Sequence, residues 1–419
     1  MNFLIANYGF PPNPGVGGRR WVKFAKYLAK AGHQVHVIHA TAEGAATSTW
    51  EDDANTAGIT RHDLPRKYVF DNPHFGNNQR VAITHRIKQR VARSWYQATS
   101  NRRFYDQAFR WKEPFLALAE NLIPQHNIEI VVATGAPFYL LEYGAILRSR
   151  HPQLRLLCDL RDPWFGAINY GMAGLEGKRL DTEKQIFRFV CEHADWVTAP
   201  NPTILESQSV SGTTIPESKR YVLSHAFDDD DLPTDCSAAV PDDDVVRIVY
   251  GGAIYGKSQP VFDSICRGLD HMREVDPDFY QHVQFDLYIN DRLPSELVQR
   301  HGQRLHVIDQ IGSEIHKKVR DADWSMLLAA GHYKDAMTTK FFEFGRSGTP
   351  FLVFGESGEL MDAVEKNSLG VCLETSRLGQ EPGVLLDTLR NGFQPNSAYF
   401  DAHCYQSRTD ELTRLFTTN

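Results

Sequence analysis

Short apolar runs alternate with longer amphipathic stretches along most of this 419-residue chain. The first run, at residues 3–6, is followed by apolar positions at helical spacing over residues 19–31, and then by a second run at residues 35–38. Gly32 stands where a glycine commonly ends a helix. Strand, helix and strand in this order predict the opening of a parallel α/β sheet.

The same alternation continues through both halves of the chain. In the first half, further strands are predicted at residues 128–132, 154–158, 196–199 and 221–223, with helices at 140–150 and about 179–192. In the second half, strands are predicted at residues 245–250, 283–289, 304–308, 324–328, 351–354 and 369–373, with a helix at about 260–274. The pattern therefore predicts two α/β units of similar size.

The composition changes between these units. Residues 228–231 are four consecutive aspartates, and residues 242–244 are three more. Because like charges repel and disfavour packing, we interpret this stretch as a linker. The predicted organisation is an N-terminal Rossmann-like domain, an acidic linker, a C-terminal Rossmann-like domain and a terminal helix that packs back on the N-terminal domain, at residues 1–227, 228–244, 245–400 and 401–419.

The overall balance of 45 Lys+Arg against 52 Asp+Glu gives a net charge of −7, which argues against a general nucleic-acid binder. Residues 61–115, here called the basic segment, run against this trend with 12 basic and 4 acidic residues. They belong to a predicted helical insertion at about 61–125. Ile83, Ile87, Val91 and Trp95 repeat at i, i+4 spacing, which fits either a core-facing helix or one lying on an anionic membrane surface.

Six cysteines are far apart and form no C-x-x-C motif, which argues against a disulfide framework or a zinc motif. The N-terminus does not resemble a signal peptide, and no stretch approaches the length of a membrane span. We therefore expect a cytoplasmic protein, with the basic segment favouring peripheral attachment to the inner face of the membrane.

Two glycine-rich loops follow predicted strands, at the strand ends where parallel sheets bind ligands. In the first loop, the backbone N–H groups of Gly17 and Gly18 can approach an anion, and Arg19 and Arg20 add donors. A flexible turn is the alternative. The second loop, residues 250–257, contains Gly252 and ends in Lys257, which suits a diphosphate but equally fits a lysine in solvent.

A third stretch runs over residues 335–343. Thr338 or Thr339 is predicted to cap a helix that ends at Gly348, so that N–H groups, two hydroxyls and Lys340 surround one anion-sized position. This arrangement would suit the same phosphates as the second loop.

Carboxylates stand beside these basic positions. Glu343, one turn into the predicted helix, can accept hydrogen bonds from sugar hydroxyls, although helical glutamates are commonly solvated. In a fourth stretch, Asp159 and Asp162 flank Arg161 at the end of a strand. The end of a strand is a position where open α/β sheets bind ligands, and an ion pair between Arg161 and these aspartates is the structural alternative.

The order of these motifs resembles glycosyltransferase family 4, whose members have the GT-B fold. Residues 5–35 resemble that family's first strand, glycine loop and first helix, and residues 159–164 resemble the D-x-R-D-P-W stretch of one bacterial branch. Residues 226–228 stand where the family has an Asn-Gly-Phe-Asp turn. Asp335 and Glu343 stand where it has two glutamates separated by seven residues. The resemblance covers nearly the whole chain.

This resemblance implies two Rossmann-like domains facing across a cleft, and transfer of a sugar from a nucleoside-diphosphate sugar to a glycan, lipid-linked or other acceptor with retention of configuration. It implies neither a metal nor another cofactor. Glu343 would bind the ribose, lysines and threonines the diphosphate, and Asp335 the transferred sugar. The predicted catalytic residues are Asp335, Asp162 and Lys257, and the predicted donor-binding residues are Glu343, Lys257, Thr338, Thr339, Lys340, Gly17, Gly18 and Gly252.

The sequence departs from the family pattern at several positions. Asp335 replaces the first glutamate, Thr338 and Thr339 replace glycines, and Ala253 stands near the place of an arginine. Two alternatives therefore stay open: a non-hydrolysing nucleotide-sugar epimerase of the same architecture, and a catalytically degenerate sugar-nucleotide binding protein. An oxidoreductase is less well supported because the strict dinucleotide fingerprint is absent.

Overall fold

The computed structural model describes residues 1–14, 17–41, 48–66, 87–88, 90–92, 94–95, 106–165, 172, 175–232, 244–254 and 258–417. These residues form two compact units, residues 1–224 together with 409–419, and residues 225–408. The sequence predicts that the N-terminal domain ends at residue 227, and the division between the two compact units lies at residue 224.

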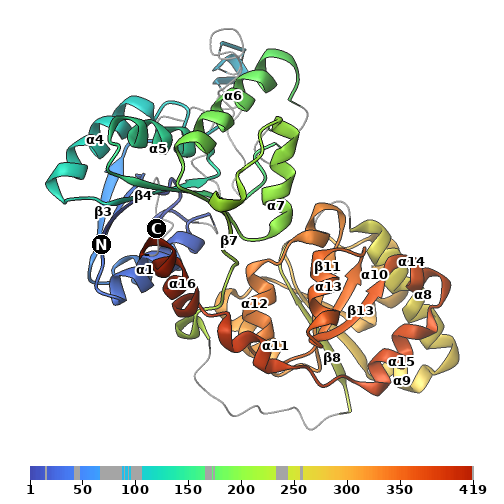
Figure 1. Ribbon diagram of the computed structural model, residues 1–419. Coiled ribbons are helices and arrows are strands. Elements are labelled where there is room, and N and C mark those ends of the chain that lie inside the picture. The colour runs from blue at the N-terminus through green and yellow to red at the C-terminus, as the bar shows by residue number, and fades with distance from the viewer. Residues whose placement is uncertain are drawn as a thin grey trace. The chain divides into compact units, whose positions relative to one another are not determined.

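The first unit contains a parallel sheet of seven described strands in the order β3-β2-β1-β4-β5-β6-β7 (Figure 1). The strands are β1 Asn2–Ala6, β2 Gln34–Ala40, β3 Ile59–Leu64, β4 Ile130–Gly135, β5 Arg155–Leu160, β6 Trp196–Ala199 and β7 Arg220–Val222. The helices are α1 Arg19–Lys30, α2 Glu51–Ala54, α4 Lys112–Gln125, α5 Tyr139–Arg150, α6 Gly177–His193 and α7 Pro202–Ser207. Helix α16 Tyr405–Thr417 begins in the second unit and belongs to the first from residue 409 onward. The strand–helix alternation predicted for this half is confirmed.

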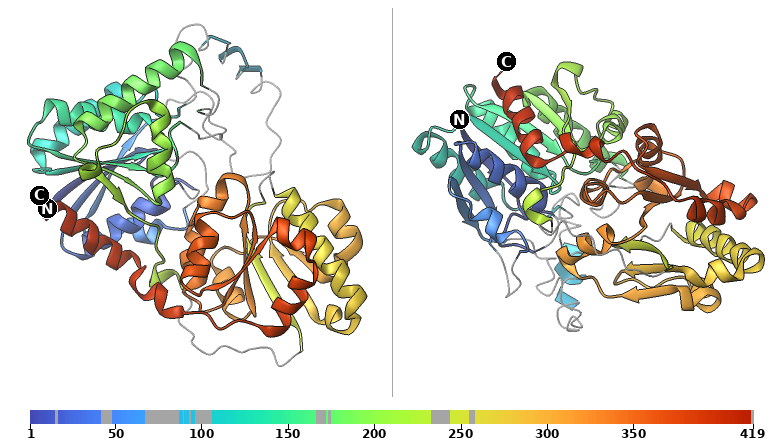
Figure 2. Two further views of the ribbon diagram at one scale, coloured as in Figure 1. Left: turned by 45° about the vertical axis from the view of Figure 1, so that its right-hand side comes forward. Right: turned by 90° about the horizontal axis from the view of Figure 1, so that it is seen from below.

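Helices cover both faces of this sheet, with α4 and α5 on one side and α1 on the other (Figures 1 and 2). All six residues of β4 are buried, which explains why the central strands are continuous apolar runs rather than alternating ones. The end of α16 packs against the sheet through Phe416, whose ring lies 5.6 Å from that of Phe3 and 5.1 Å from that of Trp196.

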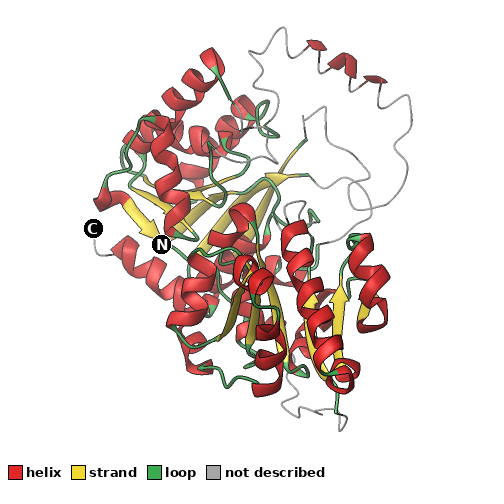
Figure 3. Cartoon of the chain, turned by 90° about the vertical axis from the view of Figure 1, so that its right-hand side faces the viewer, coloured by secondary structure: helices red, strands yellow, loops and turns green. Residues whose placement is uncertain are grey.

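The second unit contains six described parallel strands in the order β10-β9-β8-β11-β12-β13. Figure 3 distinguishes the strands of the molecule from the helices that pack around them. The strands are β8 Val246–Gly251, β9 Val283–Tyr288, β10 Leu305–Ile308, β11 Trp324–Ala329, β12 Phe351–Gly355 and β13 Gly370–Glu374. The helices are α8 Gln259–Val275, α9 Pro277–His282, α10 Ser295–His301, α11 Ile315–Arg320, α12 Thr339–Gly345, α13 Glu359–Lys366, α14 Thr375–Gln380 and α15 Gly383–Asn391.

Successive residues of each strand enter two different apolar clusters in this unit. Ile248 and Tyr250 pack with α8, α14 and α15, whereas Val249 packs with α12 and α13. This is the alternation expected where side chains of one strand point to opposite faces of a sheet.

Each sheet has a position where the order of strands reverses. In the first unit β1 lies between β2 and β4, and in the second β8 lies between β9 and β11. Loops that leave the carboxyl ends of such neighbouring strands in opposite directions form the usual ligand position of open α/β sheets. The loops after β8 and β11, together with α12, contain the predicted donor-binding residues of the second unit.

Three predicted segments differ in the structure. Asp228, at the start of the predicted acidic linker, is fully buried and its carboxylate accepts a hydrogen bond from the Asp230 N–H, so the compact unit already includes it. The helix predicted to end at Gly348 ends at Gly345. Gly348, with φ of +79°, instead closes a turn that leads into β12. The predicted insertion at 61–125 begins in β3 and ends in the core helix α4.

Candidate functional site

The end of β8 and the start of α12 bring together two residues that belong to separate predicted motifs. Gly252 follows β8 with φ of +145°, and its N–H donates to the carbonyl of Tyr288 at 3.1 Å. A Cβ atom at Gly252 would overlap Nζ of Lys340, in the first turn of α12. The positive φ therefore favours glycine at this position, and the absence of a side chain leaves room for the lysine that lies against it.

The charged amine of Lys340 lies in a partly desolvated position. Its Nζ lies 5.9 Å from the centre of the Tyr250 ring, and no acidic oxygen of the described chain lies within ion-pair distance. Burial lowers the pKa of Lys340, and the negative charge of Glu343 partly opposes this effect. An anion that replaced the lost solvation would be stabilised strongly here.

The loop after β8 is held in place by polar contacts. The Tyr250 hydroxyl donates to the carbonyl of Ala253 at 2.7 Å, and the N–H of Ile254 donates to the Asp291 carboxylate at 2.7 Å. Neither Tyr250 nor Asp291 was singled out from the sequence, because nothing local marks a tyrosine or an aspartate as the support of a distant loop. Lys257 lies outside the described residues.

The predicted cap of α12 differs from expectation. Thr338 stands at the position before the helix but its side chain makes no capping hydrogen bond, and Thr339 is the first helical residue. Thr338 is exposed and Thr339 half-buried. The two hydroxyls therefore adjoin Lys340 in sequence at the first turn, without the capping role that was predicted.

The two carboxylates of the 335–343 stretch have different surroundings. Asp335 Oδ1 accepts a hydrogen bond of 3.2 Å from the N–H of Glu359, in the first turn of α13, and lies close to Gly358. This contact gives Asp335 a role in positioning α13. Glu343 is half-buried on α12, three residues after Lys340 and electrostatically coupled to it.

In the first unit, Asp159 is the centre of a buried hydrogen-bond network. Its carboxylate accepts two bonds of 3.1 Å from the guanidinium of Arg20 and a bond of 2.8 Å from the Trp21 indole. The hydroxyls of Thr198 and Thr134 donate to it at 2.8 and 3.3 Å. Asp159 is fully buried, so this aspartate fastens α1 to the sheet rather than facing a substrate.

This network corrects the proposed role of Arg20. The sequence predicts that Arg20 contacts an anion, but its guanidinium is buried and also donates to the carbonyls of Leu223 and Ser224 at 2.7 and 3.1 Å. The donors of Arg20 are thus directed inward. Arg19 is buried as well.

Arg161 connects the glycine loop with the end of β4. It donates to the carbonyl of Gly17, to that of Ala136 at 2.9 Å, and to Asp162 at 3.3 Å. The ion pairing of Arg161 that was considered as an alternative is therefore present. Asp162 keeps a 37% exposed side chain, which leaves its carboxylate accessible.

Gly18 has a steric reason to be glycine. A Cβ atom there would overlap the carbonyl oxygen of Gly9, so the loop can pack on itself only without a side chain at this position. This close backbone approach accounts for Gly18, and anion binding by Gly17 and Gly18 stays a prediction.

The described part of the basic segment resolves one alternative. Ile87, Val91 and Trp95 are 58%, 65% and 65% exposed, so these side chains do not belong to the core. The interpretation as a core-facing helix is therefore wrong for them, while Ile83 lies outside the described residues. Within the described chain, no helix combines the length and apolar character that spanning a membrane requires.

Comparisons with known proteins agree on the fold. No protein-family model matches the sequence, and no curated protein matches it either. The sucrose-phosphate synthase of Thermosynechococcus elongatus matches with a TM-score of 0.64 at 13% identity, covering 100% of this chain and 98% of that one. The E. coli trehalose-6-phosphate protein bound with UDP-2-fluoro glucose matches with a TM-score of 0.63 at 13% identity, covering 100% and 99%.

A third match has a different described activity. A protein assigned as a UDP-N-acetylglucosamine 2-epimerase from Listeria monocytogenes has a TM-score of 0.52 at 12% identity, covering 100% of this chain and 96% of that one. At such identities the similarity concerns the fold. With its two parallel-sheet α/β units, the chain has the GT-B fold of glycosyltransferases.

Proposed function

We propose that this protein is a glycosyltransferase that moves a sugar from a nucleoside-diphosphate sugar to a glycan, lipid-linked or other hydroxyl acceptor, with retention of configuration. The observation that carries the proposal is the position of Lys340. Its amine lies against Gly252 at the strand-order reversal of the second sheet, partly desolvated and without an acidic oxygen at ion-pair distance in the described chain. Such a position favours binding of a diphosphate.

The second unit supplies the donor site in this proposal. Lys340, assisted by Lys257 and by the hydroxyls of Thr338 and Thr339, neutralises the diphosphate, while Glu343 accepts hydrogen bonds from the ribose. Gly252 permits the close approach of the backbone that this arrangement needs. The structures matched above include one bound with UDP-2-fluoro glucose, a nucleotide sugar of the proposed class.

The bond changes explain why a cation is useful here. The bond between the anomeric carbon and the diphosphate oxygen breaks, the acceptor oxygen bonds to that carbon, and the acceptor proton leaves with the departing diphosphate. Negative charge grows on the diphosphate as its bond breaks. A fixed cation therefore stabilises the transition state more than the bound donor, and this difference accelerates the reaction.

Two carboxylates complete the proposal. Asp335 contacts the transferred sugar from its position beside α13, and Asp162 of the first unit serves the acceptor side through its accessible carboxylate. We further propose that transfer requires no divalent metal, so that added Mg²⁺ or Mn²⁺ leaves the rate unchanged.

A variant series tests the donor site. Glu343→Ala, Lys340→Met and Lys257→Ala are each expected to lower turnover at least about tenfold, equivalent to about 1.4 kcal/mol of transition-state stabilisation. Lys318→Met, an exposed lysine of α11, is the matched control and should retain full activity. Unchanged transfer kinetics in the first two variants would refute the donor-site assignment.

The second candidate function is nucleotide-sugar epimerisation, which the match to the Listeria epimerase favours. The two reactions differ in their products, because transfer releases a nucleoside diphosphate whereas net epimerisation keeps the nucleotide sugar intact. Chromatography of reaction mixtures separates these outcomes. A catalytically degenerate binding protein would produce neither change while still binding the donor.

For the acceptor side, we propose that the basic segment attaches the cytoplasmic protein peripherally to an anionic membrane. The support is the exposed row Ile87, Val91 and Trp95 together with exposed Lys88 and Arg90. Apolar side chains can insert among lipid chains while basic ones contact anionic headgroups. Co-sedimentation with liposomes should increase with anionic lipid content and fall in Val91→Asp. Binding independent of anionic lipid would contradict the proposal.

A further inference from the structure

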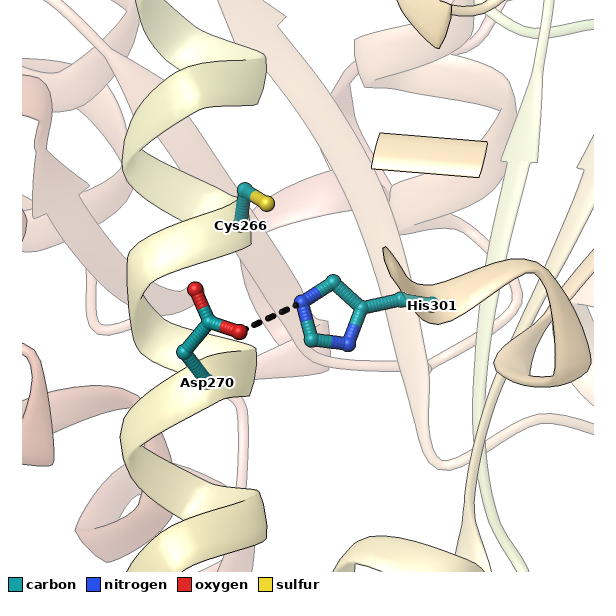
Figure 4. Close-up of side chains that lie close together, drawn as sticks. All are labelled: Cys266, Asp270 and His301. Atoms are coloured by element: carbon teal, nitrogen blue, oxygen red, sulfur yellow. Dashed lines mark ion pairs between the residues drawn. The ribbon is translucent and has the colours of Figure 1, made fainter. Parts of the chain in front are cut away.

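A cluster of three side chains with metal-binding chemistry lies between α8 and α10, within the second unit (Figure 4). Cys266 and Asp270 are four residues apart on α8 and therefore share one face of that helix. His301 is the last residue of α10, which packs against α8. The picture shows the thiol, the carboxylate and the imidazole directed into the same space.

The geometry of the cluster is tight. The three potential ligand atoms, one from each residue, all lie within 4.8 Å of one another, and His301 Nε2 is 3.3 Å from Asp270 Oδ1. Cys266 is 4% exposed and His301 only 1%. A single ion can therefore reach all three ligands after small side-chain adjustments.

A second observation concerns the imidazole alone. His301 Nε2 is buried and makes no hydrogen bond among the described residues, although the Asp270 carboxylate is near. The other ring nitrogen, Nδ1, lies 2.9 Å from the hydroxyl of Tyr280. If Nδ1 donates to that oxygen, the ring is fixed in orientation with the Nε2 lone pair directed into the cluster, as metal-binding histidines require.

We propose that Cys266, Asp270 and His301 bind one Zn²⁺ ion. Sulfur, imidazole nitrogen and carboxylate oxygen are the three ligand types that zinc combines in proteins. The ion would join α8 to α10, the helix between β9 and β10, and thereby stabilise the second unit. The site is separate from the residues proposed for the donor and does not rest on the proposed reaction.

Two arginines compete with the ion for the carboxylate. Arg273 donates to Asp270 Oδ1 at 2.9 Å, and Arg300 donates to Oδ2 while also pairing with Glu296 at 3.0 Å. Zinc binding therefore requires Oδ1 to be shared or released by Arg273. These contacts moderate the affinity, and they keep Asp270 ordered when no metal is bound.

The experiment uses the full-length protein, treated with a chelator, reduced and then titrated with Zn²⁺ or Co²⁺. We expect one metal per chain and, with Co²⁺, a thiolate-to-metal charge-transfer absorption. Cys266→Ser should lose that absorption, and both Cys266→Ser and His301→Gln should bind Zn²⁺ at least about a hundredfold more weakly. Cys372→Ser, which removes another buried thiol of the same unit, is the matched control and should bind normally.

Thermal unfolding with Zn²⁺ adds a readout that does not depend on the variants. A ligand at a hundred times its Kd raises the unfolding free energy by about 2.7 kcal/mol, so zinc should raise the unfolding temperature of the second unit in the wild type. Absence of charge-transfer absorption and of zinc stabilisation in the wild-type protein would overturn the proposal. So would binding that Cys266→Ser leaves unchanged.

Discussion

Replacing Asp159 by asparagine tests whether this aspartate, in a motif that suggested chemistry, is structural. The substitution keeps the side-chain shape but removes the negative charge that faces Arg20. One oxygen of the carboxylate becomes an NH₂ group, and an amide cannot accept from all five donors that now converge on it, two of which come from Arg20. Because Arg20 is buried, its charge cannot recover this loss by hydration.

The expected magnitude follows from this burial. Breaking a buried pair by neutralising one partner costs about 3–5 kcal/mol, because the remaining charge stays uncompensated. For a folding unit of this size, each kcal/mol lowers the unfolding temperature by about 2–4 °C, so Asp159→Asn should lower it by about 6–20 °C. Asp162→Asn, three residues later and more exposed, should change stability by less than about 1 kcal/mol.

Tryptophan fluorescence is a suitable assay because six of the seven tryptophans lie in residues 1–224, and one of them, Trp21, donates directly to Asp159. Urea unfolding followed by fluorescence therefore reports mainly on the first unit. Replacing both partners with apolar residues, Asp159→Leu with Arg20→Leu, should be less destabilising than the sum of the single changes by about 2 kcal/mol. An Asp159→Asn protein that is inactive but as stable as the wild type would refute the structural assignment.

Two further predictions concern pH and the donor loop. Burial, with smaller contributions from His126 and His62, lowers the pKa of His36 to about 4. The folded protein therefore binds this proton less readily than the unfolded chain. The stabilising effect of neutral His36 is complete above about pH 6.5 and is lost as the pH falls towards 4. The free energy of unfolding should decrease over this range by about 3 kcal/mol at most. Urea unfolding at both ends of this range should show a smaller pH dependence in His36→Gln, and an equal dependence would contradict it. Gly252→Ala should displace Lys340 and weaken donor binding at least about tenfold, as measured by calorimetry. An unaltered affinity would show that Lys340 does not contribute to donor binding.

The arrangement of strands could be predicted because it depends on local pattern. Each buried strand is a short apolar run, and each helix places its apolar positions at helical spacing, so the order of elements follows directly from the sequence. The same pattern indicated that Gly252 and Lys340 both follow strands. Their direct contact depends on β8 and β11 being neighbours, which local pattern does not specify.

The roles of individual charged residues were harder to predict. Arg20 follows a glycine loop, which favours an anion, yet its partner Asp159 lies 139 residues later and becomes its neighbour only through the order of the strands. The cluster of Cys266, Asp270 and His301 could not be predicted for the same reason. A motif of closely spaced cysteines cannot reveal ligands that come from two helices, α8 and α10, with α9 and β9 between them in the sequence.

The end of α12 shows a further limit. Gly348 has the positive φ that its position suggested, but the helix already stops at Gly345, where a side chain would overlap the ring of Phe400. The sequence alone indicates that Gly348 closes the turn, but it does not indicate that the ring of Phe400 is packed against Gly345.

The most direct test of the proposed function is a donor screen that follows binding and chemistry together. A panel of nucleoside-diphosphate sugars would be measured by calorimetry against the wild type, Lys340→Met and Lys318→Met, with release of nucleoside diphosphate monitored in parallel. We predict that one donor class binds the wild type and the Lys318→Met control equally, binds Lys340→Met at least about tenfold more weakly, and is converted to nucleoside diphosphate. If no nucleotide sugar binds, or if binding is indifferent to Lys340, the account of the donor site is contradicted.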